Sequence, residues 1–295
     1  MKLLITDIDG TLTDGNRVPE EVAEACGRLR ARGWKLMIAT GRIWASARPF
    51  AEAIGSDLPS IVYDGARVLQ DGGSTPLPFR EWKIPNRTAD RVLALGWGSS
   101  LLIQAYGDEE VTCRPSDEVT QRFFRGLGVP VSPDLKDPRL DFDPYRIIFY
   151  GDPKEARALG ESIREILATE VEVTLAGEGF LDILPAGVSK GAAFRAYRTT
   201  AGLRPEVVVA AGDHLNDIDL LLEADLAVTF EDAPLEVRAA CHLVLPPASC
   251  MGFLELCRFL ERGEFPRFFS NIVRKHKRGC PVFLRGQPPE TKREV

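Results

Sequence analysis

A short apolar strand that ends in a pair of aspartates constrains this chain more than any other feature. Residues 3–5 form an apolar run typical of a buried parallel strand, which ends at Asp7-Ile8-Asp9-Gly10-Thr11. Asp7 and Asp9 are two residues apart on extended backbone, so their side chains leave the same face of the chain. Carboxylates placed there repel each other and lose hydration, so they either lie in a polar loop or bind a cation. Oxygen ligands favour a hard cation, and Mg²⁺ is the first candidate.

Strands and helices alternate through the first 76 residues, which predicts an α/β fold. Apolar runs at 35–39 and 60–63 each follow a helical pattern, and they end at Thr40-Gly41-Arg42 and Asp64-Gly65-Ala66. Strands without a polar face predict a Rossmann-like, doubly wound parallel sheet that helices cover on both sides. Because ligands bind at the carboxyl ends of such strands, we expect both aspartates and Thr40 to converge there if the first two strands are neighbours.

Between residues 77 and 185 the pattern changes from alternation to paired strands. The predicted hairpins join residues 101–106 to 109–114 and residues 171–175 to 180–184. A strand at 146–150 leads into a helix between them. Such a run of strands and helices predicts a separate α+β unit inserted into the parallel-sheet domain.

The chain therefore divides into a core, a cap and a tail. We expect the core to comprise residues 1–76 and 186–262, the α+β cap domain residues 77–185, and a basic amphipathic tail residues 263–295. Within the cap, the Pro- and Asp-rich residues 126–145 predict a long loop. Three polar cap residues close to strand ends or turns either face the cleft or lie at the surface: Arg114, Arg146 and Glu178.

The alternation of strands and helices resumes at Ser189-Lys190-Gly191. Ser189 is a good N-cap, which places Lys190 in the first turn of a helix. A lysine there opposes the helix dipole, so this position favours a bound phosphate, the alternative being an exposed lysine without a role. The next strand, at 206–211, breaks at Gly212-Asp213-His214-Leu215-Asn216-Asp217, where Asp213 can complete a metal site and Asn216 can orient phosphate or water.

Composition and charge exclude several classes of protein. A net charge of −6 argues against wrapping nucleic acid, and no stretch is apolar for long enough to span a bilayer, so we expect neither a nucleic-acid partner nor a transmembrane segment. The chain reaches a carboxylate too early for a secretory signal. Six scattered cysteines indicate free thiols in a reducing compartment, and three dispersed histidines argue against zinc. We therefore expect a cytoplasmic protein.

Four motifs, in order, resemble those of the haloacid dehalogenase (HAD) superfamily phosphatases. They are Asp7-Ile8-Asp9-Gly10-Thr11, Ala39-Thr40-Gly41-Arg42, Ser189-Lys190-Gly191 and Gly212-Asp213-x-x-Asn216-Asp217. The large insert between the second and third motifs resembles the Cof-type subfamily IIB with a C2 cap, which includes sugar phosphatases and phosphomannomutase. The resemblance covers about residues 1–260.

The resemblance implies a role for each matching residue. Asp7 is the nucleophile, Asp9 the general acid and base, and Mg²⁺ is held by Asp7, Asp213 and the backbone carbonyl of Asp9. The residues that it assigns to the phosphoryl group and the substrate are Thr40, Gly41, Arg42, Lys190 and Asn216, with Asp217 in support. Two positions depart from the pattern, because Asp64 and Asp232 stand where relatives usually carry Asn; these acids either face the phosphate site or point at solvent.

We therefore expect a Mg²⁺-dependent phosphomonoester hydrolase that forms an aspartyl-phosphate and acts on a small phosphorylated metabolite, with a sugar phosphate first among the candidates. One alternative is a phosphotransferase or phosphomutase of the phosphomannomutase type, which would use the same Asp7. Another is a non-catalytic binding protein that relies on its tail. In the tail, apolar residues from Phe265 to Val273 follow a helical period, and a basic run follows at 274–278. Such a helix packs on its own core or on a second subunit, or docks on an anionic surface, so the protein is a monomer or a homodimer.

Overall fold

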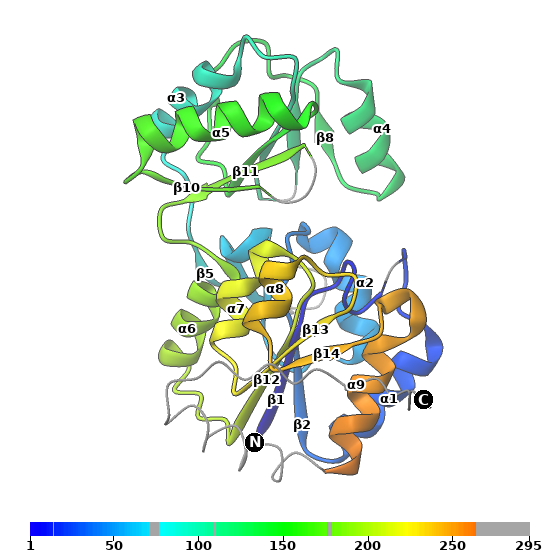
Figure 1. Cartoon of the computed structure of the whole chain (residues 1–295). Coiled ribbons are helices and arrows are strands. Elements are labelled where there is room, and N and C mark those ends of the chain that lie inside the picture. Colours follow the sequence, from blue (N-terminus) through cyan, green and yellow to red (C-terminus); the bar gives the residue numbers. More distant parts are fainter. Residues whose placement is uncertain (14, 71–76, 109, 176–178, 264–295) are drawn as a thin grey trace, which may run out of the picture.

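The computed structural model describes residues 1–263 apart from residues 14, 71–76, 109 and 176–178. These residues form two units, a core and a cap, and the cap lies above the core in Figure 1. The predicted tail helix lies outside the described residues and stays a prediction. No helix within the described part of the chain is long and apolar enough to cross a membrane. The free thiols in the described part of the chain include Cys26, Cys113, Cys241 and Cys257.

The core is built on a sheet of parallel strands in the order β14-β13-β12-β1-β2. These strands are β1 (Lys2–Thr6), β2 (Trp34–Ile38), β12 (Val207–Ala211), β13 (Leu226–Phe230) and β14 (Leu243–Leu245). Strand β1 pairs with β2 on one side and with β12 on the other, so the first two strands are neighbours, as predicted. Side chains from Leu3 to Ile5 are fully buried, and each contributes about 1.5–3 kcal/mol to stability.

Helices cover both faces of this sheet (Figure 1), which confirms the predicted doubly wound α/β class. The helices on one face are α1 (Glu20–Ala31), α2 (Trp44–Ile54) and α9 (Gly252–Arg262). Those on the other face are α6 (Lys190–Thr200), α7 (Ile218–Leu222) and α8 (Leu235–Ala240). An apolar cluster lies between the sheet and each helix layer, so both faces of the strands are dry.

A second, three-stranded sheet continues from the edge of the core. Strand β3 (Ser60–Val62) lies beside the end of β2 through a parallel bridge between Ala39 and Ile61. It pairs with β4 (Arg67–Gln70), which in turn pairs with β5 (Leu77–Glu81). The predicted boundary assigned residues 77–81 to the cap, whereas β5 belongs to the β3-β4-β5 sheet. An antiparallel pattern in a sequence does not reveal which sheet a strand joins.

The cap is a six-stranded sheet in the order β10-β11-β9-β6-β7-β8. Its strands are β6 (Leu102–Tyr106), β7 (Val111–Cys113), β8 (Val131–Ser132), β9 (Arg146–Tyr150), β10 (Val171–Leu175) and β11 (Phe180–Pro185). Both predicted hairpins are confirmed, because β6 pairs with β7 and β10 with β11 in antiparallel register. Helices α3 (Asn86–Gly96) and α5 (Pro153–Leu167) pack on the sheet face turned away from the core (Figure 1).

Helix α4 (Glu118–Gly126) lies at the end of the cap formed by β7 and β8. Neither α4 nor α3 was predicted from the sequence. Val119, Phe123 and Phe124 follow a helical spacing that the sequence prediction overlooked, although only Thr120 and Phe124 of α4 are buried. Of the predicted long loop over 126–145, the first residue ends α4, and the rest is irregular apart from the two-residue strand β8.

Candidate active site

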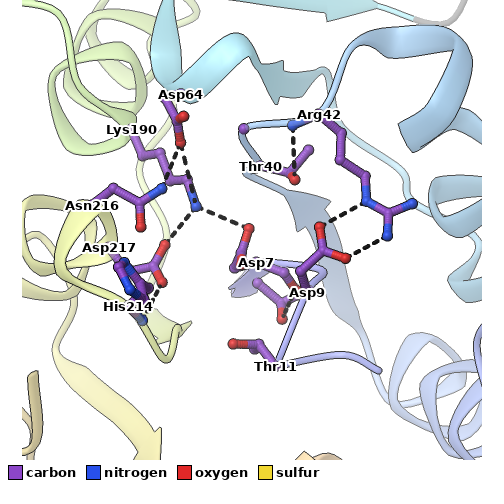
Figure 2. A network of polar contacts seen from close by, with 12 residues as sticks. Asp7, Asp9, Thr11, Thr40, Arg42, Asp64, Lys190, His214, Asn216 and Asp217 are labelled. Atoms are coloured by element: carbon purple, nitrogen blue, oxygen red, sulfur yellow. Dashed lines mark hydrogen bonds and ion pairs between the residues drawn. The ribbon is translucent and has the colours of Figure 1, made fainter. Parts of the chain in front are cut away.

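Four neighbouring strands end at one edge of the core, and each is followed by a polar side chain. Asp7 directly follows β1, whereas Thr40, Asp64 and Asp213 each lie two residues beyond the ends of β2, β3 and β12. Figure 2 shows Asp7 and Asp64 on either side of the amino group of Lys190, the first residue of α6. The predicted site residues that line one cavity of about 600 Å³ between core and cap are Asp7, Asp9, Thr40, Gly41, Arg42, Lys190, Asp213 and Asn216. Asp217 is fully buried behind them.

The loop after β1 locks against the loop after β12. Gly10 has φ +74°, and a Cβ added there would lie 2.3 Å from Oδ2 of Asp213. Only glycine combines that backbone conformation with such a close approach. Thr11 Oγ1 donates to Oδ1 of the same Asp213 at 2.6 Å, so this aspartate is held from two sides.

Three carboxylates gather under these loops and leave room for a divalent cation. Oxygens of Asp7, Asp213 and Asp217 all lie within 4.8 Å of one another. Burial raises the pKa of Asp7, and so do the nearby charges of Asp217 and Asp213, although Lys190 opposes them. Burial, followed by the charge of Asp217, likewise raises the pKa of Asp213 to about 7. Such carboxylates gain from a hard cation, and an all-oxygen donor set is what Mg²⁺ prefers.

Lys190 places a buried cation among these acids. Ser189 caps α6 by accepting from the backbone N–H of Ala192, which sets the first turn as the sequence predicted. Nζ of Lys190 donates to Oδ1 of Asp7 at 2.9 Å and to Oδ1 of Asp217 at 2.6 Å. Burial acts to lower the pKa of Lys190, but the charges of Asp217, Asp7 and Asp64 outweigh it and raise that pKa, so the side chain stays charged.

Asp9 stands apart from this cluster in the described structure. Both of its carboxylate oxygens accept from the guanidinium of Arg42, which lies 4.4 Å above the ring of Phe50. Thr40 Oγ1 accepts from the backbone N–H of Arg42 at 3.2 Å, which fixes the start of this turn (Figure 2). Among the described residues, the Asp9 carboxylate is thus outside the group of acids that could share an ion, so only its backbone carbonyl is left for the predicted metal contact.

The two acids that depart from the family pattern differ in their surroundings. Asp64 is buried, with φ +52°, and its Oδ1 accepts from Nδ2 of Asn216 at 2.7 Å. Its Oδ2 lies 2.9 Å from Nη2 of Arg146. Burial acts to raise the pKa of Asp64, but the charges of Arg146 and Lys190 outweigh it and hold that pKa below its ordinary value. Asp232, in contrast, is exposed to solvent.

Of the polar cap residues singled out in the sequence, only Arg146 is placed at the cleft. Its guanidinium pairs with Asp182 through two hydrogen bonds and donates from Nη1 to the carbonyl of Gly41 in the core at 2.6 Å. Arg114 stays within the cap, where it covers the ring of Trp97, and Glu178 lies outside the described residues. Sequence reasoning missed Asp182, although a single acid inside the apolar strand β11 was the available signal.

The family of the chain follows from comparison with known proteins. A family model described as haloacid dehalogenase-like hydrolase matches residues 4–255. The chain belongs to this family. The resemblance to this family, expected from the motifs, is thereby confirmed, and solved structures share the fold with its inserted cap.

The alignments with several known proteins span most of this chain and most of each relative. Phosphoglycolate phosphatase of Methanoculleus marisnigri is 28% identical over 272 residues, which are 92% of this chain and 99% of that protein. HMP-PP phosphatase of Serratia proteamaculans is 25% identical over 258 residues, 86% of this chain and 91% of that protein. Among solved structures, a protein of Thermotoga maritima has a TM-score of 0.71 at 25% identity and covers 87% of this chain and 96% of its own. A sugar phosphatase of HAD subclass IIB has a TM-score of 0.73 at 22% identity, with coverage of 88% and 99%.

Proposed function

We propose that this HAD hydrolase removes phosphate from small phosphorylated metabolites with the help of Mg²⁺ and through a phosphate ester formed on Asp7. The observation that carries the proposal is the group formed by Asp7, Asp213 and Asp217 beside the buried amino group of Lys190. A carboxylate next to a fixed cation and a candidate metal site is what attack on a phosphoryl group requires. The relatives named as phosphatases support the same chemistry.

The donor set fits a hard divalent cation. We assign its binding to the carboxylates of Asp7 and Asp213 and the backbone carbonyl of Asp9, with Asp217 beside them. Mg²⁺ bound there would neutralise charge on the phosphoryl oxygens and relieve the repulsion among these acids. The close packing of Gly10 against Asp213 and the hydrogen bond from Thr11 support this assignment, because they hold the Asp213 carboxylate in place beside Asp7.

Each residue then has a step in the reaction. A carboxylate oxygen of Asp7 bonds to phosphorus while the bond from phosphorus to the leaving oxygen breaks, and Asp9 gives a proton to that oxygen. A water molecule next attacks phosphorus, Asp9 accepts its proton, and the bond to Asp7 breaks to release phosphate. Lys190 and Thr40 hold the phosphoryl oxygens throughout. Because Asp9 is paired with Arg42, it exchanges this partner for the leaving oxygen when substrate binds.

The experiment that tests the proposal is the replacement Asp7→Asn. We expect phosphate release to fall by at least about a thousandfold, because the amide cannot attack phosphorus. The fold should persist, since burial already disfavours the charge on Asp7 and the amide carries none. Colorimetric phosphate release, with and without a chelator and added Mg²⁺, measures the first effect, and a thermal melt measures the second. Substantial release by Asp7→Asn, or full activity in the chelator, would contradict the mechanism.

The finer choices made from the sequence stay predictions. The sequence favours a sugar phosphate, while the relatives' names, phosphoglycolate phosphatase and HMP-PP phosphatase, support a wider range of small phosphorylated molecules. Cytoplasmic location, the absence of a nucleic-acid partner and a monomeric or homodimeric state also remain predictions. A phosphomutase would use the same Asp7 but would release little phosphate from any substrate. Membership of a hydrolase family leaves the non-catalytic alternative without support.

A further inference from the structure

The cap presents one face of its sheet to the active site. Alternate residues of a strand share a face, so Arg146, Ile148 and Tyr150 of β9 point to one side of the sheet. The register places Ile148 opposite Asp182 and Tyr150 opposite Phe180. The opposite face packs against α3 and α5 as a separate apolar cluster. The first face therefore forms the cap wall of the cavity of about 600 Å³ above Asp7.

Arg146 is the charged residue of this face that lines the cavity among the described cap residues, and it is already engaged within the cap and with the core. Arg146 gives two hydrogen bonds to Asp182, one to the carbonyl of Gly41, and lies against Asp64. Both Arg146 and Asp182 are buried. A guanidinium with these partners has little capacity left for a substrate.

The polar groups around Tyr106, which also lines the cavity, are paired as well. The hydroxyl of Tyr106 donates to Oε1 of Gln104 at 2.7 Å, and Nε2 of Gln104 donates to Oγ1 of Thr120 at 2.9 Å. The Tyr106 side chain therefore offers its ring to the cavity, with its hydroxyl turned to a neighbour within the cap.

The cap surface that remains free to contact a substrate is mainly apolar. Apart from Arg146, the described cap residues that line the cavity are Tyr106, Phe123, Phe124, Leu127, Ile148 and Phe180. Phe123 is 61% exposed, and Phe180 is stacked on Tyr150 with ring centroids 4.1 Å apart, which leaves its other surface to the cavity. The polar and charged lining, in contrast, comes from the core side, where the phosphoryl group would bind.

We infer that the preferred substrate is a phosphomonoester whose leaving group carries a flat aromatic or similarly apolar part. This inference rests on the proposed function, since it assumes that the phosphoryl group lies at Asp7. Aromatic rings pack well on other aromatic rings, and their burial removes apolar surface from water on both sides. A polyhydroxylated leaving group would instead place its hydroxyls against a wall with few free hydrogen-bonding atoms, where they would lose water without replacement.

Two substrates with the same kind of leaving oxygen test the inference. 2-Phenylethyl phosphate and glucose 6-phosphate both release a primary alcohol, so their intrinsic reactivities are similar and the difference lies in recognition. We expect kcat/KM for phosphate release in the presence of Mg²⁺ to be about tenfold or more higher for 2-phenylethyl phosphate. Equal or better turnover of glucose 6-phosphate would overturn the inference and leave the proposed function intact. Absence of phosphate release from both would overturn the proposed function and this inference with it.

A matched pair of variants on α4 locates the effect. Phe123→Ala removes an aromatic ring from the cavity wall, whereas Val119→Ala removes apolar surface from the same helix at a residue that is 63% exposed and does not line the cavity. We expect Phe123→Ala to lower the ratio of kcat/KM for 2-phenylethyl phosphate to kcat/KM for glucose 6-phosphate about tenfold, mainly by raising KM for the phenylethyl ester. Val119→Ala should leave the ratio unchanged. A ratio that Phe123→Ala does not lower would count against the aromatic wall as the determinant.

Discussion

Both the backbone conformation of Asp64 and the burial of its carboxylate are energetically unfavourable by themselves. Its φ of +52° lies in the left-handed region, which residues other than Asn, Asp and Gly rarely adopt. Its carboxylate is buried between the cations of Arg146 and Lys190, while Asn216 donates to Oδ1. Removing one partner of such a buried group leaves the others uncompensated. Asp64 therefore acts on the site through its neighbours, by holding Asn216 and Arg146 in place.

The replacement Asp64→Asn tests this role. Asn tolerates the same backbone conformation, so the loss reports the carboxylate alone. We expect the free energy of unfolding to fall by about 1–3 kcal/mol, because Arg146 keeps Asp182 but loses its second acid. Urea unfolding at neutral pH measures the change. Asp232→Asn, at the exposed position that departs from the family in the same way, should change stability by less than about 0.5 kcal/mol.

The stability difference between the original protein and Asp64→Asn should also depend on pH, which gives a second test of this role. The pKa of Asp64 is held below its ordinary value of 3.8, so the folded state binds the proton less readily than the unfolded chain does. The stabilisation is thus fully present above pH 3.8 and is lost as the pH falls through the lower, folded-state pKa. A difference between the original protein and Asp64→Asn that grows on acidification would contradict this assignment.

At the scale of elements, the site depends on two loops that follow neighbouring strands. The loop after β1 turns at Gly10, and the loop after β12 carries Asp213 against it. The two loops are closely packed, because the backbone at Gly10 leaves no room for a Cβ beside the Asp213 carboxylate and Thr11 donates to the same carboxylate. The distance between the acids is therefore set by backbone packing rather than by the flexible side chains alone.

Gly10→Ala should disturb this contact. The change forces a strained φ and a clash with Asp213, so we expect a loss of about 1–3 kcal/mol in stability and a smaller rise in Tm on addition of Mg²⁺ than the original protein shows. Thermal melts with and without Mg²⁺ measure both effects. Gly15→Ala is the matched control, since its Cβ would meet only Thr13 Oγ1 at an ordinary 3.8 Å. If Gly10→Ala gained as much from Mg²⁺ as Gly15→Ala does, Asp213 would not be a ligand that this loop positions.

The core unit and its site could largely be predicted from the sequence, whereas parts of the cap could not. Apolar runs that end in polar residues predicted the buried strands β1, β2 and β12 and the edge at which their acids meet, because burial on both faces leaves an unmistakable pattern. Helix α4 was missed because it has only nine residues, too short a segment to stand out beside the Pro- and Asp-rich stretch that follows, although Val119, Phe123 and Phe124 have helical spacing. The aromatic wall formed by Phe123 and Phe124 was missed with it. The pairing of Arg146 with Asp182 was equally hidden, since it depends on the register of β9 against β11, which no local pattern encodes.

At the scale of the whole molecule, the cap and the core are held together by a mixture of packing and charge. The outer part of the cap has its own apolar cluster, beneath α3 and α5. Toward the core, the ring of Tyr63 packs 5.2 Å from Tyr145 and its hydroxyl donates to the carbonyl of Asp108 at 2.9 Å. Arg146 adds a charged connection, because it reaches from β9 to the carbonyl of Gly41. That carbonyl belongs to the turn that presents Thr40, so cap position and phosphate site are linked.

Arg146→Lys should loosen this link without unfolding either unit. Lysine keeps the charge beside Asp182 but lacks the planar fork that reaches Asp182, Asp64 and Gly41 at once. Loss of one charge-assisted hydrogen bond, about 1.5–3 kcal/mol, should speed amide hydrogen exchange in residues 39–42 and 180–184 by about 10- to 100-fold while the circular dichroism spectrum is unchanged. Arg114→Lys changes the same residue type within the cap, away from the core, and should leave both segments protected. Equal protection in the two variants would mean that Tyr63 and its neighbours hold the cap closed on their own.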